Sequence, residues 1–254
     1  MSRKTVVSII AALVFPLAAL SAEESTEAKV AQSIKELLDP NMPYMAPNGR
    51  KAAMAFLAQN PGASAIALVD KLEASKDPQQ RLWVLLALWE FKDLSLLEPV
   101  AGKFATLVND GNFGVQYWGI KLVGRLKAVD AVKPLIALTE SKEYIVRREA
   151  ALALGQIKDA TANETVTKLL KDEDPTVRAA AADAIAALEI AGAKAQLVQA
   201  LQAKDEKVFV MKSLVTAVEK ITGESLGITA TEWTRDPSVW RQKVASWVKK
   251  NKQA

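Results

Sequence analysis

The sequence predicts an all-α solenoid, a stack of about six helix pairs. The first observation is a repeat: Val115, Val146, Val177 and Val208 follow one another at intervals of 31 residues. A fixed period of about 20 to 50 residues is typical of stacked supersecondary units. The second is that no segment alternates polar and β-branched residues with a period of two, so we expect no sheet.

The repeat is strongest in the middle of the chain. Arg147 recurs as Arg178, and the small residue Gly155 has counterparts at Gly124 and Ala186. In the first half the arginine column starts with Arg50 and Arg81, and its next member is Gln116, 35 positions later. Four extra residues amount to about one helical turn, so they lengthen a helix without rotating its buried face much.

The first 22 residues have the pattern of a signal peptide. Arg3 and Lys4 precede an apolar run from Val6 to Leu20, and small residues follow it. We expect cleavage after Ala22 or Ser21. The chain contains no cysteine, so disulfides and a lipid-anchored cysteine are excluded. We therefore expect a periplasmic or secreted protein without stable membrane insertion after cleavage.

The sequence pattern predicts helices from the beginning of the mature chain. Residues 23–39 carry apolar side chains at helical spacing and end near Pro40, and residues 41–48 form an extended connection. A short helix over 49–60 is followed by a turn at Pro61-Gly62 and a helix over 63–75. Helix pairs continue to Thr222, which places the repeat domain at residues 23–222.

Capping signals and charge pairs support these helices. Asp77-Pro78 and Asp174-Pro175 each place a capping carboxylate before a proline in the first helical turn. Acid-to-base spacing of i,i+4 favours ion pairs within a helix. Three such pairs are predicted: Asp77 with Arg81, Glu143 with Arg147, and Asp174 with Arg178.

These residues resemble HEAT repeats, in particular the short form found in phycobilisome-lyase-type proteins. The match rests on Val146-Arg147, Ala150-Ala151 and Ala153-Leu154-Gly155, followed by Ile157. The resemblance covers residues 28–222 and implies a right-handed superhelix whose second helices line the inner curve. Residues 223–254 are similar to the ending of bacterial HEAT-type proteins. Their Pro237-Ser238-Val239-Trp240 helix is predicted to cap the last repeat rather than to lie on a membrane.

Composition excludes several classes of chemistry. The chain has neither histidine nor cysteine, which removes Ser-His-Asp and Cys-His catalysis and the usual ligands of zinc and copper. We therefore predict no catalytic residues, no metal site, no cofactor and no enzymatic activity. Basic and acidic residues are nearly balanced at 33 and 29, which argues against a nucleic-acid partner.

Two tryptophans at equivalent repeat positions suggest a binding surface. Trp83 and Trp118 stand in one column, and Phe113 and Tyr117 lie beside the second. Since the same column holds Glu149, we expect it to be exposed. Exposed aromatic residues commonly anchor recognition surfaces. The alternative is that the tryptophans pack into the lengthened repeat or under residues 42–45.

The sequence therefore predicts a non-enzymatic protein-binding or scaffolding module. The predicted partner-binding residues are Trp83, Phe113, Tyr117, Trp118, Arg148 and Glu149. The partner would be a protein or peptide. The family resemblance leaves open a lyase-like or chromophore-handling enzyme, and the aromatic residues leave open a cell-wall glycan binder. The arginine column is interpreted as structural, pairing with acids of its own or adjacent turns, and Asp183 is expected to be exposed.

Overall fold

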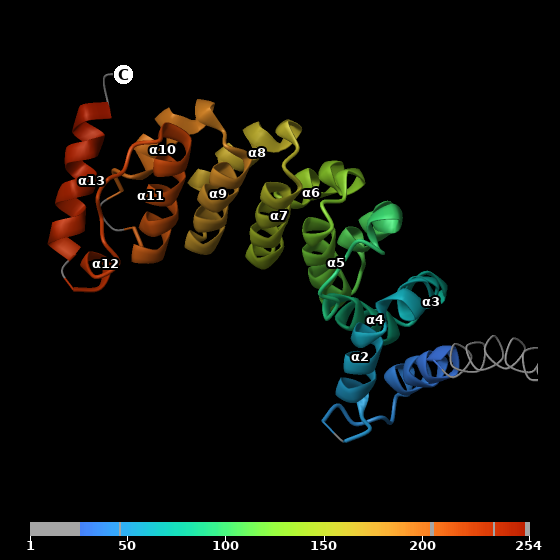
Figure 1. Cartoon of the computed structure of the whole chain (residues 1–254). Helices are drawn as coiled ribbons and strands as arrows, with labels where there is room; N and C mark the ends of the chain where they lie inside the picture. The colour runs from blue at the N-terminus through green and yellow to red at the C-terminus, as the bar shows by residue number, and fades with distance from the viewer. Residues whose placement is uncertain (1–25, 46, 204–205, 236, 252–254) are drawn as a thin grey trace, which may run out of the picture. The chain divides into compact units, whose positions relative to one another are not determined.

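All regular structure in the described part of the protein is helical. The computed structural model describes residues 26–45, 47–203, 206–235 and 237–251 (Figure 1). Within these residues there is no strand, and the protein is an α-solenoid, as predicted. The predicted signal peptide, residues 1–22, lies outside the described residues. The chain divides into two compact units, with the boundary between Pro99 and Val100.

The first unit contains two helix pairs. Its elements are a helix over residues 26–38, α2 (Arg50–Gln59), α3 (Pro61–Ala74) and α4 (Pro78–Trp89). The connection before α2, predicted to be extended, contains turns and bends in its described residues. Pro61-Gly62, predicted as a turn, instead begins α3, because Asn60 takes the N-cap position and proline is well accommodated in the first turn of a helix. Asp77 caps α4 as predicted, accepting a hydrogen bond from the backbone of Gln79.

The second unit alternates short and long helices. In order, the elements from the unit boundary to the last repeat are η1 (Glu98–Asn109), α5 (Phe113–Arg125), η2 (Val129–Ala131), α6 (Val132–Leu138), α7 (Tyr144–Ile157), η3 (Ala160–Ala162), α8 (Asn163–Lys168), η4 (Leu169–Lys171), α9 (Pro175–Leu188), η5 (Ala191–Ala193), α10 (Lys194–Ala200) and α11 (Val208–Thr222). Figure 1 shows α5, α7, α9 and α11 side by side in one layer, which we call the long-helix layer. The short helices α6, α8 and α10 form a second layer.

Small side chains explain how closely the long helices pack. A Cβ atom added at Gly155 of α7 would lie 2.8 Å from the Cα atom of Ala184 in α9. One added at Gly124 of α5 would lie 2.9 Å from the Cα atom of Ala153 in α7. The spacing of 31 residues between these glycines therefore reproduces the same close approach in successive repeats.

Three long helices end in the same unusual backbone conformation. Lys127, Lys158 and Glu189 have φ angles of 53°, 63° and 53°, in the left-handed region that glycine usually occupies. They stand 31 residues apart. The left-handed residue reverses the chain into the next short helix, so the period in the sequence is also a period in backbone geometry.

The last repeat departs from the predicted register. Val115, Val146 and Val177 are buried, whereas Val208 is 38% exposed. The residue that takes their place is Val210, which is 0% exposed and follows Val177 by 33 positions. A longer connection, residues 201–207, precedes α11 and shifts its buried face by two residues. The assignment of Val208 to this column was wrong.

Two helices, α12 (Glu232–Arg235) and α13 (Pro237–Asn251), follow α11. Trp240, Val244, Trp247 and Val248 of α13 are buried. The indole nitrogen of Trp247 donates a hydrogen bond to Glu224. Among the helices in the described ranges, none has the length and apolar character needed to cross a bilayer.

Candidate functional site

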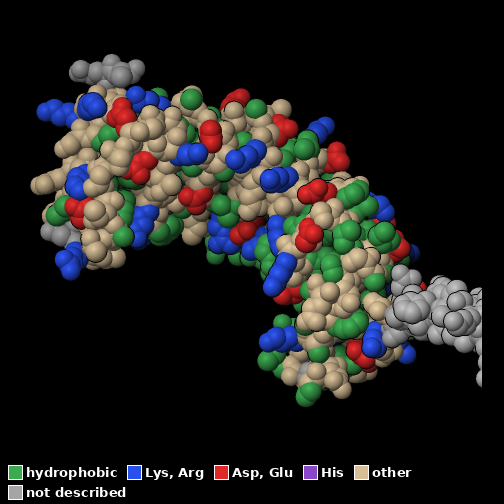
Figure 2. Space-filling model, viewed as in Figure 1, with side chains coloured by type: hydrophobic (Ala, Val, Ile, Leu, Met, Phe, Trp, Pro, Cys, Tyr) green, Lys and Arg blue, Asp and Glu red, His purple; other side chains and the backbone are tan. Residues whose placement is uncertain are grey.

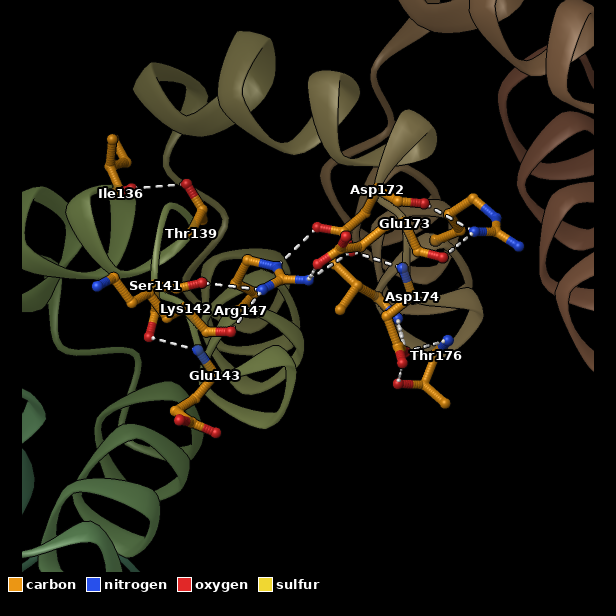
Figure 3. A network of polar contacts seen from close by, with 12 residues as sticks. Ile136, Thr139, Ser141, Lys142, Glu143, Arg147, Asp172, Glu173, Asp174 and Thr176 are labelled. Atoms are coloured by element: carbon orange, nitrogen blue, oxygen red, sulfur yellow. Dashed lines mark hydrogen bonds and ion pairs between the residues drawn. The ribbon is translucent and has the colours of Figure 1, made fainter.

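The repeated arginines of the second unit, Arg147 and Arg178, are structural. Arg147, at the start of α7, donates two hydrogen bonds of 2.8 Å to the carboxylate of Asp172 (Figure 3). It also donates to the backbone carbonyls of Ser141 and Lys142. The arginine is therefore shared between the turn before α7 and the turn before α9, as predicted for a residue that holds repeats in register. The bond to Asp172 is the largest cause of the raised pKa of Arg147.

Arg178 repeats this arrangement one helix pair later. Its guanidinium donates to both carboxylate oxygens of Glu206, at 2.7 and 2.8 Å, and to the carbonyls of Asp172 and Glu173. The bond to Glu206 raises the pKa of Arg178. Adjacent repeats are thus joined by the same buried or half-buried contact.

The predicted i,i+4 ion pairs are wrong for Arg147 and Arg178. Arg147 turns to Asp172 and not to Glu143, and Arg178 turns to Glu206 and not to Asp174. The carboxylate of Asp174 instead caps α9, accepting hydrogen bonds from the backbone of Thr176 and Val177 (Figure 3). A bidentate partner in the next repeat is stronger than a solvated pair along one helix.

The arginines of the first unit bond to backbone. Arg50 donates to the carbonyls of Leu37, Asp39 and Met42, and Arg81 donates to the carbonyl of Ser75. These bonds go to carbonyl oxygens, whereas Arg147 and Arg178 of the second unit also bind carboxylates. Arg50 thereby fastens the irregular connection before α2 onto the helix that precedes it.

Trp83 lies beneath that connection. Its ring stacks on Tyr44 at a centroid distance of 5.9 Å, and the guanidinium of Arg50 lies 4.6 Å from its centroid. It is half-buried. Of the two placements considered from the sequence, packing under residues 42–45 describes Trp83. Trp83 belongs to the first unit, and the other five predicted site residues belong to the second.

Aromatic side chains gather on α5. Phe113 stacks on Tyr117 with centroids 6.3 Å apart, and Tyr117 meets Trp118 edge-on at 5.5 Å. Lys121 extends over this group: its Nζ lies 5.2 Å from the Tyr117 centroid and 5.4 Å from the Trp118 centroid. Phe113 is 49% exposed, and Tyr117 and Trp118 are half-buried. The Phe113 ring is therefore exposed to solvent. The half-buried Tyr117 ring packs against it, and Trp118 packs against Tyr117.

Arg148 and Glu149 form an ion pair on α7. Both Nε and Nη2 of Arg148 contact Oε1 of Glu149, at 2.9 and 2.6 Å. The side chain of Glu149 is only 8% exposed, while that of Arg148 is 30% exposed. The expectation that a column containing glutamate must be exposed was therefore wrong, because an adjacent arginine compensates the buried carboxylate.

Tyr144 was not among the residues predicted to bind a partner. It is 43% exposed at the start of α7, and it follows Phe113 by one period of 31 residues. That spacing was the available signal. The solvent-accessible side chains of α5 and α7, which we call the α5–α7 face, are Phe113, Gln116, Tyr117, Trp118, Lys121, Arg125, Tyr144, Ile145, Arg148, Leu152 and Gln156.

A separate groove lies in the first unit. It has a volume of about 770 Å³ and runs between the helix over residues 26–38 and α3. Val30 and Ile34 form part of its floor, and its rim carries Lys35 and Lys71 together with Asp39. Both signs of charge stand at this rim, so charge selects no particular partner there.

The residues that the structure describes contain no cluster of three or more histidine, cysteine, aspartate or glutamate side chains able to hold a metal ion. The α5–α7 face offers rings, aliphatic carbons and cationic groups. Such a surface suits recognition by packing and charge.

Comparison with known proteins supports the repeat assignment. The family model described as HEAT repeats matches residues 101–186 and 132–215. A search of curated proteins found no match. An engineered protein of known structure is 20% identical with a TM-score of 0.57, covering 77% of this chain and 97% of its own.

Two further solved structures are more distant. Human deoxyhypusine hydroxylase in complex with glycerol is 18% identical with a TM-score of 0.35, covering 92% of this chain and 99% of its own. The Escherichia coli protein YibA is 16% identical with a TM-score of 0.41, covering 88% of this chain and 92% of its own. The engineered protein supports the fold, and the family match supports a HEAT-repeat protein whose matched repeats span residues 101–215.

Proposed function

We propose that this protein is a non-enzymatic binding module of the periplasm and that the α5–α7 face captures a polypeptide. The observation that carries the proposal is the exposure of Phe113 and Tyr144, at equivalent positions of neighbouring helices. Large apolar side chains exposed together on a soluble protein mark interaction sites. A solenoid presents such side chains on a preformed surface, which lowers the entropy lost on binding.

The packing beneath the exposed rings supports recognition over folding. Tyr117 stacks against Phe113, and Lys121 lies over Tyr117 and Trp118. Rings held in this way lose little side-chain freedom when a partner covers them. Aromatic residues supported by neighbours are typical energetic anchors of protein interfaces.

The binding test compares two double variants. Phe113→Ala with Tyr144→Ala removes the exposed rings, whereas Ile66→Ala with Val129→Ala removes exposed apolar side chains elsewhere. Immobilised wild-type protein should retain a defined set of polypeptides from a periplasmic extract. The ring variant should lose that set at an unchanged melting temperature, and the control should keep it.

The alternatives from the sequence give different results in the same experiment. Retention of purified cell-wall polymer, with no polypeptide retained, would replace the protein binder by a glycan binder. A coloured or ligand-bearing preparation would favour the chromophore-handling class. Equal retention of polypeptides by wild type and ring variant would remove the α5–α7 face from the proposal.

Export rests on residues 1–22, whose charged start and apolar run are typical of a signal peptide. The expected mature protein begins at Ala22 or Glu23. Cell fractionation with an intact-mass measurement tests this. A full-length chain recovered from the cytoplasm would contradict it.

A further inference from the structure

A second groove lies at the C-terminal end of the second unit. It has a volume of about 440 Å³ and is bounded by the end of α10, by α11 and by α13, which Figure 1 shows at this end of the chain. Its floor consists of buried apolar side chains, namely Leu201, Met211, Val244 and Val248. Ligand sites in proteins are typically concave, largely apolar and a few hundred cubic ångströms or more in volume. This groove has those properties, and it shares no lining residue with the α5–α7 face.

Two small side chains help to leave this space open. Ala203 follows α10 and Ala245 lies on α13, and both are exposed residues that line the groove. Alanine contributes only one methyl group to the lining. A larger side chain at either position would occupy part of the groove, so these two positions offer a way to fill it without touching the buried core.

The polar groups of this groove carry positive charge or none. They are Gln202, Arg241 and Lys249, and none of the described lining residues is acidic. Figure 2 shows lysine and arginine side chains interspersed with aspartate and glutamate over much of the visible surface. The groove of the first unit likewise has both signs of charge at its rim. The cationic rim is therefore a local property of the second groove, and complementary charge favours an anion there.

Lys249 is the cation of this rim that can take an ion-pair partner. Lys243 and Lys250 of the same helix already pair with Glu232 and Glu224, at 2.8 and 3.7 Å. Among the described residues, no hydrogen bond or ion pair engages Lys249. Its side chain is exposed and forms part of the groove lining. An anion can therefore bind this ammonium group without breaking an existing contact.

Arg241 and Gln202 have contacts of their own and complete the rim. The guanidinium of Arg241 lies 4.6 Å from the centroid of the Trp240 ring, so Arg241 is a wall of the groove and not the group that holds the anion. Gln202 donates one amide N–H to the carbonyl of Val198 at 2.9 Å. A side-chain amide has a second N–H, which leaves Gln202 able to donate to an oxygen in the groove.

We infer that this groove binds a small anionic amphiphile, an aliphatic chain that ends in a carboxylate. The chain would cover the apolar floor, and the carboxylate would pair with Lys249. Burial of the aliphatic carbons supplies most of the affinity. The ion pair with an exposed lysine contributes modestly and selects a carboxylate over an uncharged end group. The inference goes beyond the proposed function, because it assigns a second ligand to different residues.

Titration of isotope-labelled protein with decanoate, followed by the NMR signals of the backbone amides, tests the inference. Decanol is the matched uncharged ligand. We expect decanoate to shift the signals of Met211, Ala245 and Val248 saturably and to leave those of Phe113 and Tyr144 unchanged. Decanol should shift the same groove signals with a weaker affinity than decanoate.

Two pairs of variants separate the floor from the charge. Ala245→Phe places a ring in the groove, whereas Ser246→Phe places it at an exposed position of α13 outside the lining. Lys249→Gln removes the charge of the rim, and Lys250→Gln removes a charge outside the lining. Melting temperatures establish that each variant is folded.

Ala245→Phe should abolish the binding of both ligands, and Ser246→Phe should bind them as wild type does. Lys249→Gln should bind decanoate about fivefold more weakly, the effect of losing one exposed ion pair. The same variant should bind decanol as tightly as wild type. Lys250→Gln should bind decanoate with the affinity of wild type.

Three results would overturn the inference. Without saturable shifts at the groove residues there is no ligand site. Equal affinity of wild type and Lys249→Gln for decanoate would disprove the role of charge. Phosphatidylglycerol vesicles that bind wild type but not Lys249→Gln, with no binding of decanoate, would replace the small ligand by a membrane surface. Polypeptide retention by the α5–α7 face is measured separately, so none of these results decides the proposed function.

Discussion

Arg147 and Asp172 are 25 residues apart in sequence and form a bidentate ion pair in which each hydrogen bond is 2.8 Å long. Both side chains are nearly buried, with 9% and 8% of their surface exposed. The pair joins the first turn of α7 to the turn that precedes α9. Because Arg178 makes the equivalent contact with Glu206, a single type of polar bond connects successive repeats of the second unit.

Removing one partner of this pair should destabilise the protein strongly. Arg147→Ala leaves the Asp172 carboxylate buried without its cation, which costs about 3 kcal/mol or more of unfolding free energy. Arg147→Lys should also be destabilising because an ammonium group cannot make the bidentate contact. The matched control is Lys168→Ala, which breaks the exposed pair with Glu164 and should cost about 0.5 kcal/mol. Denaturant unfolding measures both, and equal losses would contradict the structural role.

Gly155 should not tolerate even a methyl group. The Cβ atom of Gly155→Ala would lie 2.8 Å from the Ala184 Cα atom, so α7 and α9 would have to separate. We expect a loss of about 1 to 3 kcal/mol, despite the higher helix propensity of alanine. Gly192→Ala is the control, because nothing lies within 4 Å of its added Cβ atom. Thermal unfolding of the two variants should differ by several degrees, and identical melting temperatures would disprove the close approach.

The corrected register of the last repeat makes opposite predictions for two valines. Val210→Ala removes buried methyl groups and should cost about 1 to 2 kcal/mol, whereas Val208→Ala removes exposed ones and should change stability by less than about 0.5 kcal/mol. Both substitutions have the same chemistry in the same helix. Urea titration of the two variants therefore tests the two-residue shift, and a larger loss for Val208→Ala would restore the 31-residue register.

Substituting Trp83 should lower the stability of the protein, whereas substituting Phe113 should not. Trp83→Ala removes the ring that stacks on Tyr44 and Arg50, and it should cost about 2 kcal/mol, less than a fully buried tryptophan. Phe113→Ala should leave the unfolding free energy within about 0.5 kcal/mol of wild type, because the ring is half exposed. Denaturant unfolding tests both expectations. A large loss for Phe113→Ala would mean that its ring is needed for folding.

Glu232 should contribute to the acid sensitivity of the C-terminal segment. Hydrogen bonds from Lys243 and from the backbone of Thr229 lower its pKa from 4.5 to about 2. A carboxyl group whose pKa is lowered on folding stabilises the protein above its unfolded pKa, and this contribution is lost as the pH falls towards 2. Glu232→Gln should therefore be less stable than wild type at pH 7 and equally stable near pH 2. A difference that stays constant from pH 7 to pH 2 would contradict this linkage.

Much of the fold follows from signals that are local in sequence. Asp77 and Asp174 cap α4 and α9 as predicted, because a capping carboxylate needs only backbone groups two or three residues away. The register shift in the last repeat was not recognised, since valine at both 208 and 210 satisfies the same apolar pattern. Tyr144 was not predicted as a site residue although it follows Phe113 by 31 residues, because spacing alone does not show whether a side chain is exposed.

The sequence by itself determined the helical repeats, their period and the absence of histidine and cysteine, because spacing and composition do not depend on distant contacts. Only the tertiary structure decided which carboxylate each arginine binds, that Trp83 packs beneath Tyr44, and that Glu149 is buried while Phe113 and Tyr144 reach solvent. Each of these depends on which groups folding brings within a few ångströms. Side chains at equivalent repeat positions have different neighbours, and those neighbours determine whether a side chain is buried and which charged group it pairs with.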